Sequence, residues 1–585
     1  MRLLPLIIVL TLFSCGGGGK GAEDTADGFD DDALEAGETM DTGETGEKCF
    51  AELDTEKEYT LAGLGAAVKV VKDKWGVPHI YASKKDLFYA EGFVVASDRL
   101  IQMHAMRLIS SGLFSATPVG SASDLSADVY MRVLDLRGAA EKMWEGIDKN
   151  DALLKDILES FAKGVNAYLE AIKSGKVIPP LEYGSLGEFA PWTPVDSLVI
   201  GRLQSWDLSF DGQTDEITLM KRLESLNKEF GNTALKGIVQ DALHFAPASE
   251  TTVLPEDTGE RGGSLMPPLN PQSDDYFKRF PDGYFARMEK ILEPVKEKIR
   301  GVTDTPRGSN NWVVSGGLTS SGAPMLANDT HLSLRNPPVF YQIHLNTRDS
   351  GGDIDLAGVC FPGIPGIILG HNAYFAWGGT VYYADVTDVY IETMKEGDPP
   401  TVLFNNNQVE IAIRKEEFIY NKPGDGCDSY LNDFIKGLKY ELKEEGGKCV
   451  LTVYVEVVPH HGPIIPGSKV DSGTGAITAL SWRWTGFEPS NDLKAVAGLM
   501  FGKDYNDFFT ALKDFGVGAQ NWVYAGTDGH IAYTTFCRLP VRGHLKNEPV
   551  LYPPYLPMPG DGCCEWTGDL PFEKFPQALD PKDGK

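Results

Sequence analysis

The sequence predicts an α+β protein with a largely helical first half and a strand-rich second half. Residues 86–111 and 151–173 carry apolar side chains at helical spacing, and a third helix is expected at 215–229. From residue 311 onward, short alternating apolar runs have few helices between them, a pattern typical of a large antiparallel sheet or sandwich. At 585 residues the chain is too long for one compact core, so two or more lobes are expected.

The expected strands divide into an early pair and a later series. Residues 68–71 and 79–82 flank a Pro- and Gly-containing turn within a helical lobe that we place at 51–245. A strand-rich part is expected at 309–585, with strands at 312–315, 324–327, 339–345, 374–378, 409–413, 449–458, 476–484 and 522–533. Residues 246–308 are rich in Pro, Gly, Ser and charge, so we expect a linker or removable spacer, interrupted by one helix at 284–299.

The N-terminus has the pattern of an exported protein. Residues 1–15 hold a basic residue, an apolar run too short to span a bilayer, and Leu-Phe-Ser-Cys, which resembles a bacterial lipoprotein cleavage box with lipid on Cys15. Residues 16–50 are glycine-rich and acidic and are expected to form a disordered tether. We therefore expect a periplasmic or cell-envelope lipoprotein that meets the membrane only through its lipid. The alternative is an ordinary cleaved signal with an incidental cysteine.

Charge and cysteines exclude some classes of protein. The net charge of −29 argues against a nucleic-acid partner, because phosphate binding needs a basic face. If Cys15 carries lipid, seven cysteines remain, and at least one of them is free or pairs with another molecule. Cys427 and Cys449 could close a loop, but their pairing does not follow from the sequence. No CxxC pair or zinc-type Cys/His spacing is present, so a structural zinc site is not expected.

The informative motifs are collinear. The chain has no GxSxG elbow, HExxH or P-loop, and its two SxxK matches lie in helical periodicity. Residues 307–345 begin RGSNNWVVSGG, and six further motifs are KDKWGVPHIYA (72–82), ASDRLIQMHAMR (96–107), APWTPVDSL (190–198), GHNAYFAWGGT (370–380), HGPII (461–465) and AQNWVYAGTDGHIAY (519–533). Together they resemble the penicillin acylases and acyl-homoserine-lactone acylases, which are N-terminal-nucleophile hydrolases, over most of residues 59–577.

This resemblance implies an αββα fold of stacked antiparallel sheets and a precursor that cuts itself at Gly308–Ser309 into an α-chain and a β-chain. A serine hydroxyl needs a base to remove its proton. A free α-amine at Ser309 has a pKa of about 7.7–8.0 and can serve, whereas a lysine amine near 10.4 cannot at neutral pH. Glycine at 308 permits the backbone distortion of the cut. The alternative is a turn serine with no catalytic role.

The resemblance also assigns the remaining catalytic groups. The N–H of Val381 and the side-chain amide of Asn521 would hold the oxyanion, since an amide donates without carrying charge. His331 falls at a position that contacts the nucleophile, and Arg542 matches a supporting arginine near the amide. Asn521 as a strand-end polar cap and His331 as an ordinary loop histidine stay open.

Calcium and an acyl pocket are further implications of the resemblance. A structural calcium ion would be bound by Glu216, Asp385, Asp388 and the Thr387 carbonyl, tying the two halves together. The alternative is that these acids are solvated surface charges. The matching acyl-pocket positions are Trp206, Phe210, Leu332, Leu369 and Gly379. Tryptophan is bulkier than the family's usual methionine and Gly379 smaller than its usual serine, so aromatic and aliphatic acyl groups both remain open.

The expected function is hydrolysis of small N-acyl amides through an acyl-enzyme on Ser309. Family β-chains usually continue beyond the position of Lys585, so we expect the chain to lack the usual C-terminal part. The alternatives are a catalytically inactive, acylase-like binding lipoprotein, or another serine amidase using Ser160 and Lys163. Two polypeptides from one precursor would distinguish the self-processing hydrolase from both alternatives.

Overall fold

The computed structural model describes residues 55–59, 65, 68–209, 215–242, 279–303, 308–332, 335–382, 384–471, 476–546 and 552–585. The expected signal, lipidated Cys15 and acidic tether, as well as Phe210, lie outside these residues. Within them, no helix combines the length and the apolar character that a membrane span requires.

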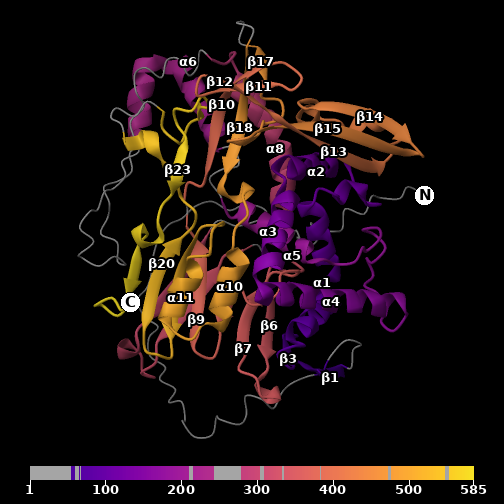
Figure 1. The fold of residues 1–585 in the computed structure, drawn as a ribbon, viewed down its shortest axis with the longest axis vertical. Coiled ribbons are helices and arrows are strands. Elements are labelled where there is room, and N and C mark those ends of the chain that lie inside the picture. Colours follow the sequence, from indigo (N-terminus) through magenta and orange to yellow (C-terminus); the bar gives the residue numbers. More distant parts are fainter. Residues whose placement is uncertain are drawn as a thin grey trace, which may run out of the picture.

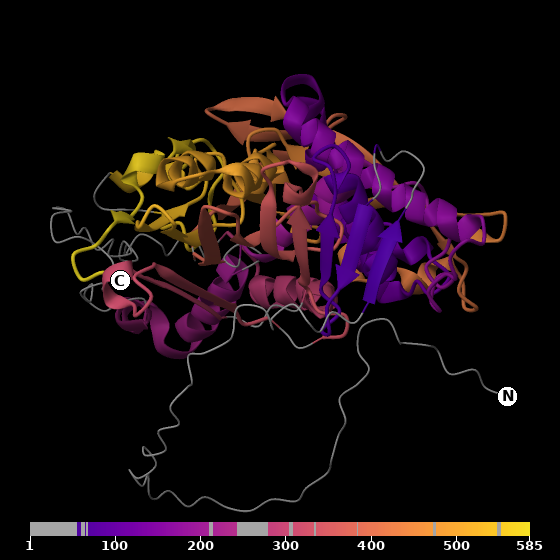
Figure 2. The same cartoon turned by 90° about the horizontal axis from the view of Figure 1, so that it is seen from below.

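A ten-stranded sheet joins the two halves of the chain. Its order is β1-β2-β3-β6-β7-β8-β9-β19-β20-β24. The strands are β1 (Thr55–Tyr59), β2 (Val68–Lys72), β3 (Pro78–Tyr81), β6 (Tyr341–Asn346), β7 (Asp355–Cys360), β8 (Leu369–His371), β9 (Phe375–Val381), β19 (Gln520–Gly526), β20 (Ile531–Phe536) and β24 (Gln577–Leu579). Neighbours are antiparallel except β3 and β6, where the N-terminal strands meet the later ones in parallel. Figure 2 shows this junction, with β1–β3 in indigo.

Helices form the rest of the N-terminal lobe (Figure 1). They are α1 (Leu87–Ser110), α2 (Ala122–Leu134), α3 (Leu136–Asn150), α4 (Ala152–Lys173), α5 (Pro194–Asp207) and α6 (Asp215–Ala242). The α1–α4 crossing depends on two glycines: a Cβ on Gly92 would lie 2.2 Å from the Phe161 oxygen, and one on Gly164 1.9 Å from the Tyr89 oxygen. The sequence predicted α1, α4 and the start of α6, and missed α2, α3 and α5.

Residues 246–308 were expected to form a linker or removable spacer, but the helix predicted within them is part of the core. The predicted helix is present as α8 (Tyr284–Thr303) and packs against α2 and α6. Tyr284, Phe285, Met288 and Leu292 are at most 2% exposed. Its apolar stripe belongs to the main core, so removal of this helix would expose that core.

Two smaller sheets lie at the other end of the molecule. One has the order β12-β11-β10-β18-β17, with β22 beside β10; its strands are β10 (Thr387–Lys395), β11 (Thr401–Phe404), β12 (Asn407–Glu410), β17 (Val470–Asp471), β18 (Ile477–Trp484) and β22 (Met558–Pro559). The other projects as an arm in Figure 1 and contains β13 (Ala412–Asn421), β14 (Lys439–Glu445), β15 (Lys448–Val458) and β16 (Gly462–Pro463). The strand predicted at 409–413 is thus divided between β12 and β13. Cys427 and Cys449 form a disulfide in the arm.

A hairpin stacked on the main sheet carries the expected nucleophile. It consists of β4 (Ser309–Val314) and β5 (Met325–Thr330). Val313 of β4 packs with Val523, Ala525 and Ile531 of β19 and β20. The opposite face of β19 and β20 contacts α11 (Tyr505–Leu512), which lies beside α10 (Asp492–Phe501). A helix layer, a broad sheet and a second small sheet therefore stack in that order, which confirms the α+β class.

Candidate active site

The peptide expected to be cut is held by two hydrogen bonds. The Ser309 hydroxyl donates to the Gly308 carbonyl oxygen at 2.7 Å, and the backbone N–H of His331 donates to the same oxygen at 3.1 Å. The antiparallel register, which sets Ser309 opposite Thr330, brings His331 to this place. The hydroxyl thus lies against the carbonyl group expected to be attacked, and a backbone donor already faces its oxygen.

The His331 ring lies beside the same peptide. Its Nε2 is 3.2 Å from Asp329 Oδ2 and 3.4 Å from Asn310 Nδ2. A Cβ built on Gly308 would lie 3.2 Å from the ring Nδ1, closer than most side-chain contacts. Glycine at 308 therefore leaves room for the imidazole. The structure places His331 next to the nucleophile as predicted; its role there stays a prediction.

The two expected oxyanion donors lie next to each other on neighbouring strands. The Asn521 amide donates to the Val381 carbonyl oxygen at 3.1 Å and is 3.3 Å from Thr380 Oγ1. The Tyr533 hydroxyl donates to Asn521 Oδ1 at 2.8 Å. Burial raises the pKa of Tyr533 to about 12, so this phenol stays protonated and keeps the amide nitrogen turned toward Val381. A substrate oxyanion would have to replace one of the amide's present acceptors.

Two asparagines that the sequence analysis missed fix the hairpin on the sheet. Asn311 Nδ2 donates to the Asn521 carbonyl oxygen at 3.3 Å. Asn328 accepts from Gly379 N at 2.8 Å and donates to Gly379 O at 3.1 Å. The sequence did contain a signal for these two residues, because asparagine is disfavoured inside strands and normally needs a specific hydrogen-bond partner there.

A cavity of about 290 Å³ opens beside these groups. Gly308, Ser309, Thr380 and Val381 line it together with mostly apolar side chains, among them Leu198, Leu332, Val339, Phe340, Phe361, Ile364, Leu369, Val496, Phe515 and Trp522. Of the predicted acyl-pocket residues, Leu332, Leu369 and Gly379 line this cavity. A Cβ on Gly379 would lie 3.2 Å from Leu369 Cδ2, so glycine widens the cavity.

The prediction for Trp206 is wrong in this structure. Trp206 is 1% exposed and does not line the cavity. Its ring packs edge-on against Trp484 at a centroid distance of 4.8 Å and lies 6.5 Å from Tyr130. It stabilises the contact between α5 and β18 because its large apolar area is buried there.

Arg202 is a cavity residue that the sequence analysis missed. It is 2% exposed, and its Nη2 donates to Ser490 Oγ at 2.8 Å and lies 3.8 Å from Asp492. Nε and Nη1 have no hydrogen-bond partner among the described residues. Burial lowers the pKa of Arg202, while Asp492 raises it. One arginine among the apolar residues of α5 was the available signal, since buried charges are rare.

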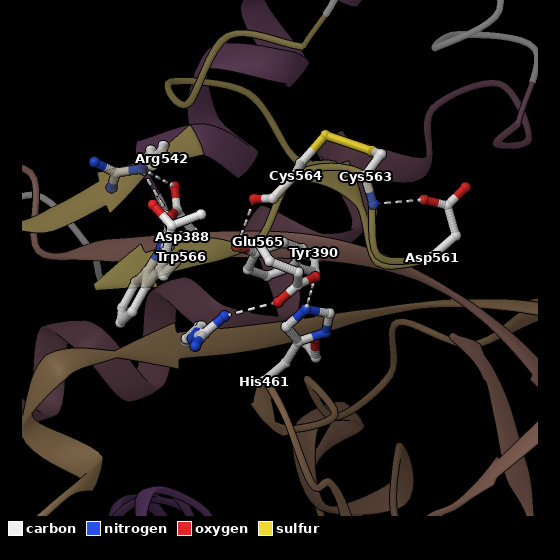
Figure 3. Close-up of polar contacts among 12 residues, drawn as sticks. Asp388, Tyr390, His461, Arg542, Asp561, Cys563, Cys564, Glu565 and Trp566 are labelled. Carbon is white, nitrogen blue, oxygen red and sulfur yellow. Dashed lines mark hydrogen bonds and ion pairs between the residues drawn. A yellow bond between two sulfur atoms is a disulfide. The ribbon is translucent and has the colours of Figure 1, made fainter. Parts of the chain in front are cut away.

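Arg542 does not support Asn521; it binds the residues expected to hold calcium (Figure 3). Its Nε donates to Asp388 Oδ2 at 2.9 Å, and its Nη2 donates to Asp385 Oδ1 at 2.7 Å and to the Thr387 carbonyl at 3.1 Å. Burial alone would lower the pKa of Arg542, but Asp388 and Asp385 raise it, so the guanidinium stays charged. Trp566 Nε1 also donates to Asp388.

Calcium does not fit this arrangement, because a guanidinium already neutralises the same oxygens and the ion would have to displace it. Glu216, the fourth expected ligand, is 5% exposed in the first turn of α6.

Taken together, a serine against a glycine carbonyl, a neighbouring amide donor and an apolar cavity make up a site suited to acyl transfer. The model of the penicillin amidase family matches residues 67–585, and the chain belongs to this family.

Relatives include penicillin acylase 2 proenzyme of Pseudomonas sp. SE83, 28% identical over 90% of this chain and 58% of that protein. The acyl-homoserine lactone acylase QuiP of Pseudomonas aeruginosa is 26% identical over 90% of this chain and 55% of its own length. A solved penicillin G acylase from Alcaligenes faecalis overlaps 47% of this chain and 43% of its own, with 23% identity and a TM-score of 0.35. The chain spans somewhat more than half the length of the two curated relatives.

Proposed function

We propose that this chain is a self-processing hydrolase of N-acyl amides, with Ser309 as the nucleophile freed by cleavage of the Gly308–Ser309 peptide. The observation that carries the proposal is the position of the Ser309 hydroxyl, 2.7 Å from the Gly308 carbonyl oxygen. Family membership and the names of the relatives support the reaction class.

Self-cleavage would use the contacts around Gly308. Ser309 Oγ attacks the Gly308 carbonyl carbon and loses its proton, and the His331 N–H stabilises the charge that develops on the oxygen. The C–N bond then breaks, the nitrogen takes up a proton, and the glycyl group is left as an ester on Ser309 Oγ. Water hydrolyses this ester and leaves a free amine and a free hydroxyl on Ser309.

The same hydroxyl would then act on substrate. The Ser309 α-amine, with a pKa near neutrality, takes the hydroxyl proton directly or through a water molecule. Oγ attacks the amide carbon, and the Val381 N–H and the Asn521 amide hold the oxyanion. The leaving amine takes the proton, and water hydrolyses the acyl-enzyme. The ten-stranded sheet would keep the two chains together, because it includes strands from both sides of the cut.

The cavity favours an acyl group that is apolar next to the reacting carbonyl. Most of its lining is apolar, and apolar surface buried there contributes about 25 cal/mol per Å². Arg202 adds hydrogen-bond donors to the wall, so an acyl group with an acceptor could use them as well.

The test compares hydrolysis of phenylacetyl, short-chain, long-chain and carboxyl-terminated acyl amides by the wild type and by Ser309→Ala. We expect turnover of apolar acyl amides that Ser309→Ala abolishes. If the folded wild type binds these amides without hydrolysing any of them, the chain is a binding lipoprotein and the proposal fails. A preference for the carboxyl-terminated substrate would contradict the proposed apolar acyl group but not the proposed amide hydrolysis.

A further inference from the structure

A second group of polar side chains lies apart from the catalytic cavity, at the end of the molecule that carries the arm. Glu392 is in β10 and is fully buried, and the turn after β15 supplies His460 and His461. One ligand atom from each of these three residues lies within 4.8 Å of the other two. The proposed reaction uses none of them.

Three neighbouring side chains hold the imidazole ring of His461 in place. Its Nδ1 lies 2.5 Å from Glu392 Oε1, and its Nε2 lies 3.0 Å from Glu565 Oε1. The ring of Tyr390 stacks on the imidazole at a centroid distance of 3.7 Å. Glu565 is itself held by Arg483 at 2.9 Å. Figure 3 shows His461 with its contact to Glu565, and Tyr390 next to both.

Two ligand atoms in this group are buried and unused. Glu392 Oε2 and His460 Nε2 have no hydrogen-bond partner in the described part of the chain. Leaving such atoms buried and unpaired is unfavourable, and more so for a charged group. A Cβ on Gly560 would lie 2.6 Å from Glu392 Oε2, so glycine at 560 keeps the space beside this oxygen free.

We propose that Glu392, His460 and His461 bind one zinc-class divalent cation. Two imidazoles and a carboxylate are a common zinc ligand set, with bonds of about 2.0–2.2 Å that place neighbouring ligand atoms about 3.3 Å apart. The ligand atoms now lie up to 4.8 Å apart, and a shift of His460 would bring them to bonding distance. His460 is half-buried in a turn and packs against the tilted ring of Phe404. The ion replaces the proton between His461 Nδ1 and Glu392 Oε1, and that proton passes to water.

The surroundings supply what a zinc site needs beyond its ligands. A metal-bound histidine normally donates its other N–H to a carboxylate, and Glu565 already accepts from His461 Nε2. A cavity of about 450 Å³ is lined by both histidines together with Arg483, Trp484, Glu488 and Trp566. It gives the ion access and leaves the fourth coordination position to water.

The test uses the full-length protein, stripped with EDTA and then titrated with zinc by calorimetry, with the metal content measured after gel filtration. We expect one zinc per chain, and binding at least tenfold weaker in His460→Gln, which alters a half-buried turn and should fold. Glu565→Gln should weaken binding by about tenfold or more, because it removes the orienting carboxylate. Cobalt should give tetrahedral visible absorption in the wild type and not in His460→Gln.

The matched control is His371→Gln, which alters an exposed histidine on β8 and should bind zinc like the wild type. A wild type that binds no stoichiometric zinc overturns the proposal. So does an unchanged affinity in a folded His460→Gln, or zinc binding that is lost only in Asp388→Asn. None of these results bears on the proposed hydrolase activity, because the two cavities share no lining residue.

Discussion

Glu91 connects the stability of the protein to pH. It lies in α1 with no exposed surface, and its Oε1 accepts from the N–H of Gly366 at 2.8 Å. Oε2 has no partner among the described residues. Burial raises the pKa of Glu91 from 4.5 to about 8, although the Gly366 N–H works in the opposite direction. Gly366 follows a loop whose Phe361 and Ile364 line the catalytic cavity, so this carboxyl supports one wall of the site.

The sign of the effect follows from the two pKa values. Below pH 4.5 the carboxyl is protonated in both the folded and the unfolded chain, and its stabilising contribution is complete. As the pH rises from 4.5 toward 8, the unfolded chain ionises while the folded chain stays protonated, so stability is lost. The shift of about 3.5 pKa units, at about 1.36 kcal/mol each, sets an upper limit of about 5 kcal/mol lost by pH 8.

Glu91→Gln keeps an acceptor for Gly366 and removes the ionisation. We expect this variant to unfold at a higher temperature than the wild type at pH 8 and at a similar temperature at pH 5, as measured by circular dichroism. Glu145→Gln is the control, because Glu145 is an exposed glutamate in α3 that pairs with Lys149. Equal pH dependence of wild type and Glu91→Gln between pH 5 and 8 would refute the reasoning.

Three further predictions concern the site, the acid cluster and the N-terminus. Asn521→Ala should lower kcat about 100-fold to 1,000-fold on an amide substrate, because it removes one oxyanion donor; a smaller loss would exclude that role. Adding calcium should leave the melting temperature of the wild type unchanged, whereas Arg542→Gln frees Asp385 and Asp388 and should make the melting temperature rise with calcium. A wild type whose melting temperature rises with added calcium would restore the calcium hypothesis. Cys15→Ala should release the protein from membranes on fractionation, and an unlipidated wild type by mass spectrometry would contradict the anchor.

Helices and strands whose apolar residues recur regularly on one buried face could be predicted from the sequence. The stripe of Leu154, Ile157 and Phe161 predicted α4, and alternating residues predicted β15 and β18. The helix α8 was predicted, but its burial was not, because the Pro- and Gly-rich residues around it indicated a linker. Whether an apolar stripe finds a partner depends on distant segments, here α2 and α6, and local composition does not contain that information.

The site residues were predicted from the family resemblance, and in the structure backbone register brings several of them together. Ser309, His331, Val381 and Asn521 come together because the β4–β5 hairpin lies over β9 and β19. Side-chain direction was not predictable in the same way. Trp206 turns into the core, and Arg542 turns toward the acids, since a buried guanidinium needs carboxylates and a neutral amide gives it less.

The central claim is that Ser309 cuts its own chain and becomes an N-terminal nucleophile. Intact-mass analysis and N-terminal sequencing of the purified full-length protein test it most directly. We predict two polypeptides in the wild type, with the one that contains Asn521 beginning at Ser309, and a single uncut chain in Ser309→Ala. A wild type that hydrolyses amides while uncut, or whose new N-terminus is a residue other than Ser309, would contradict the account.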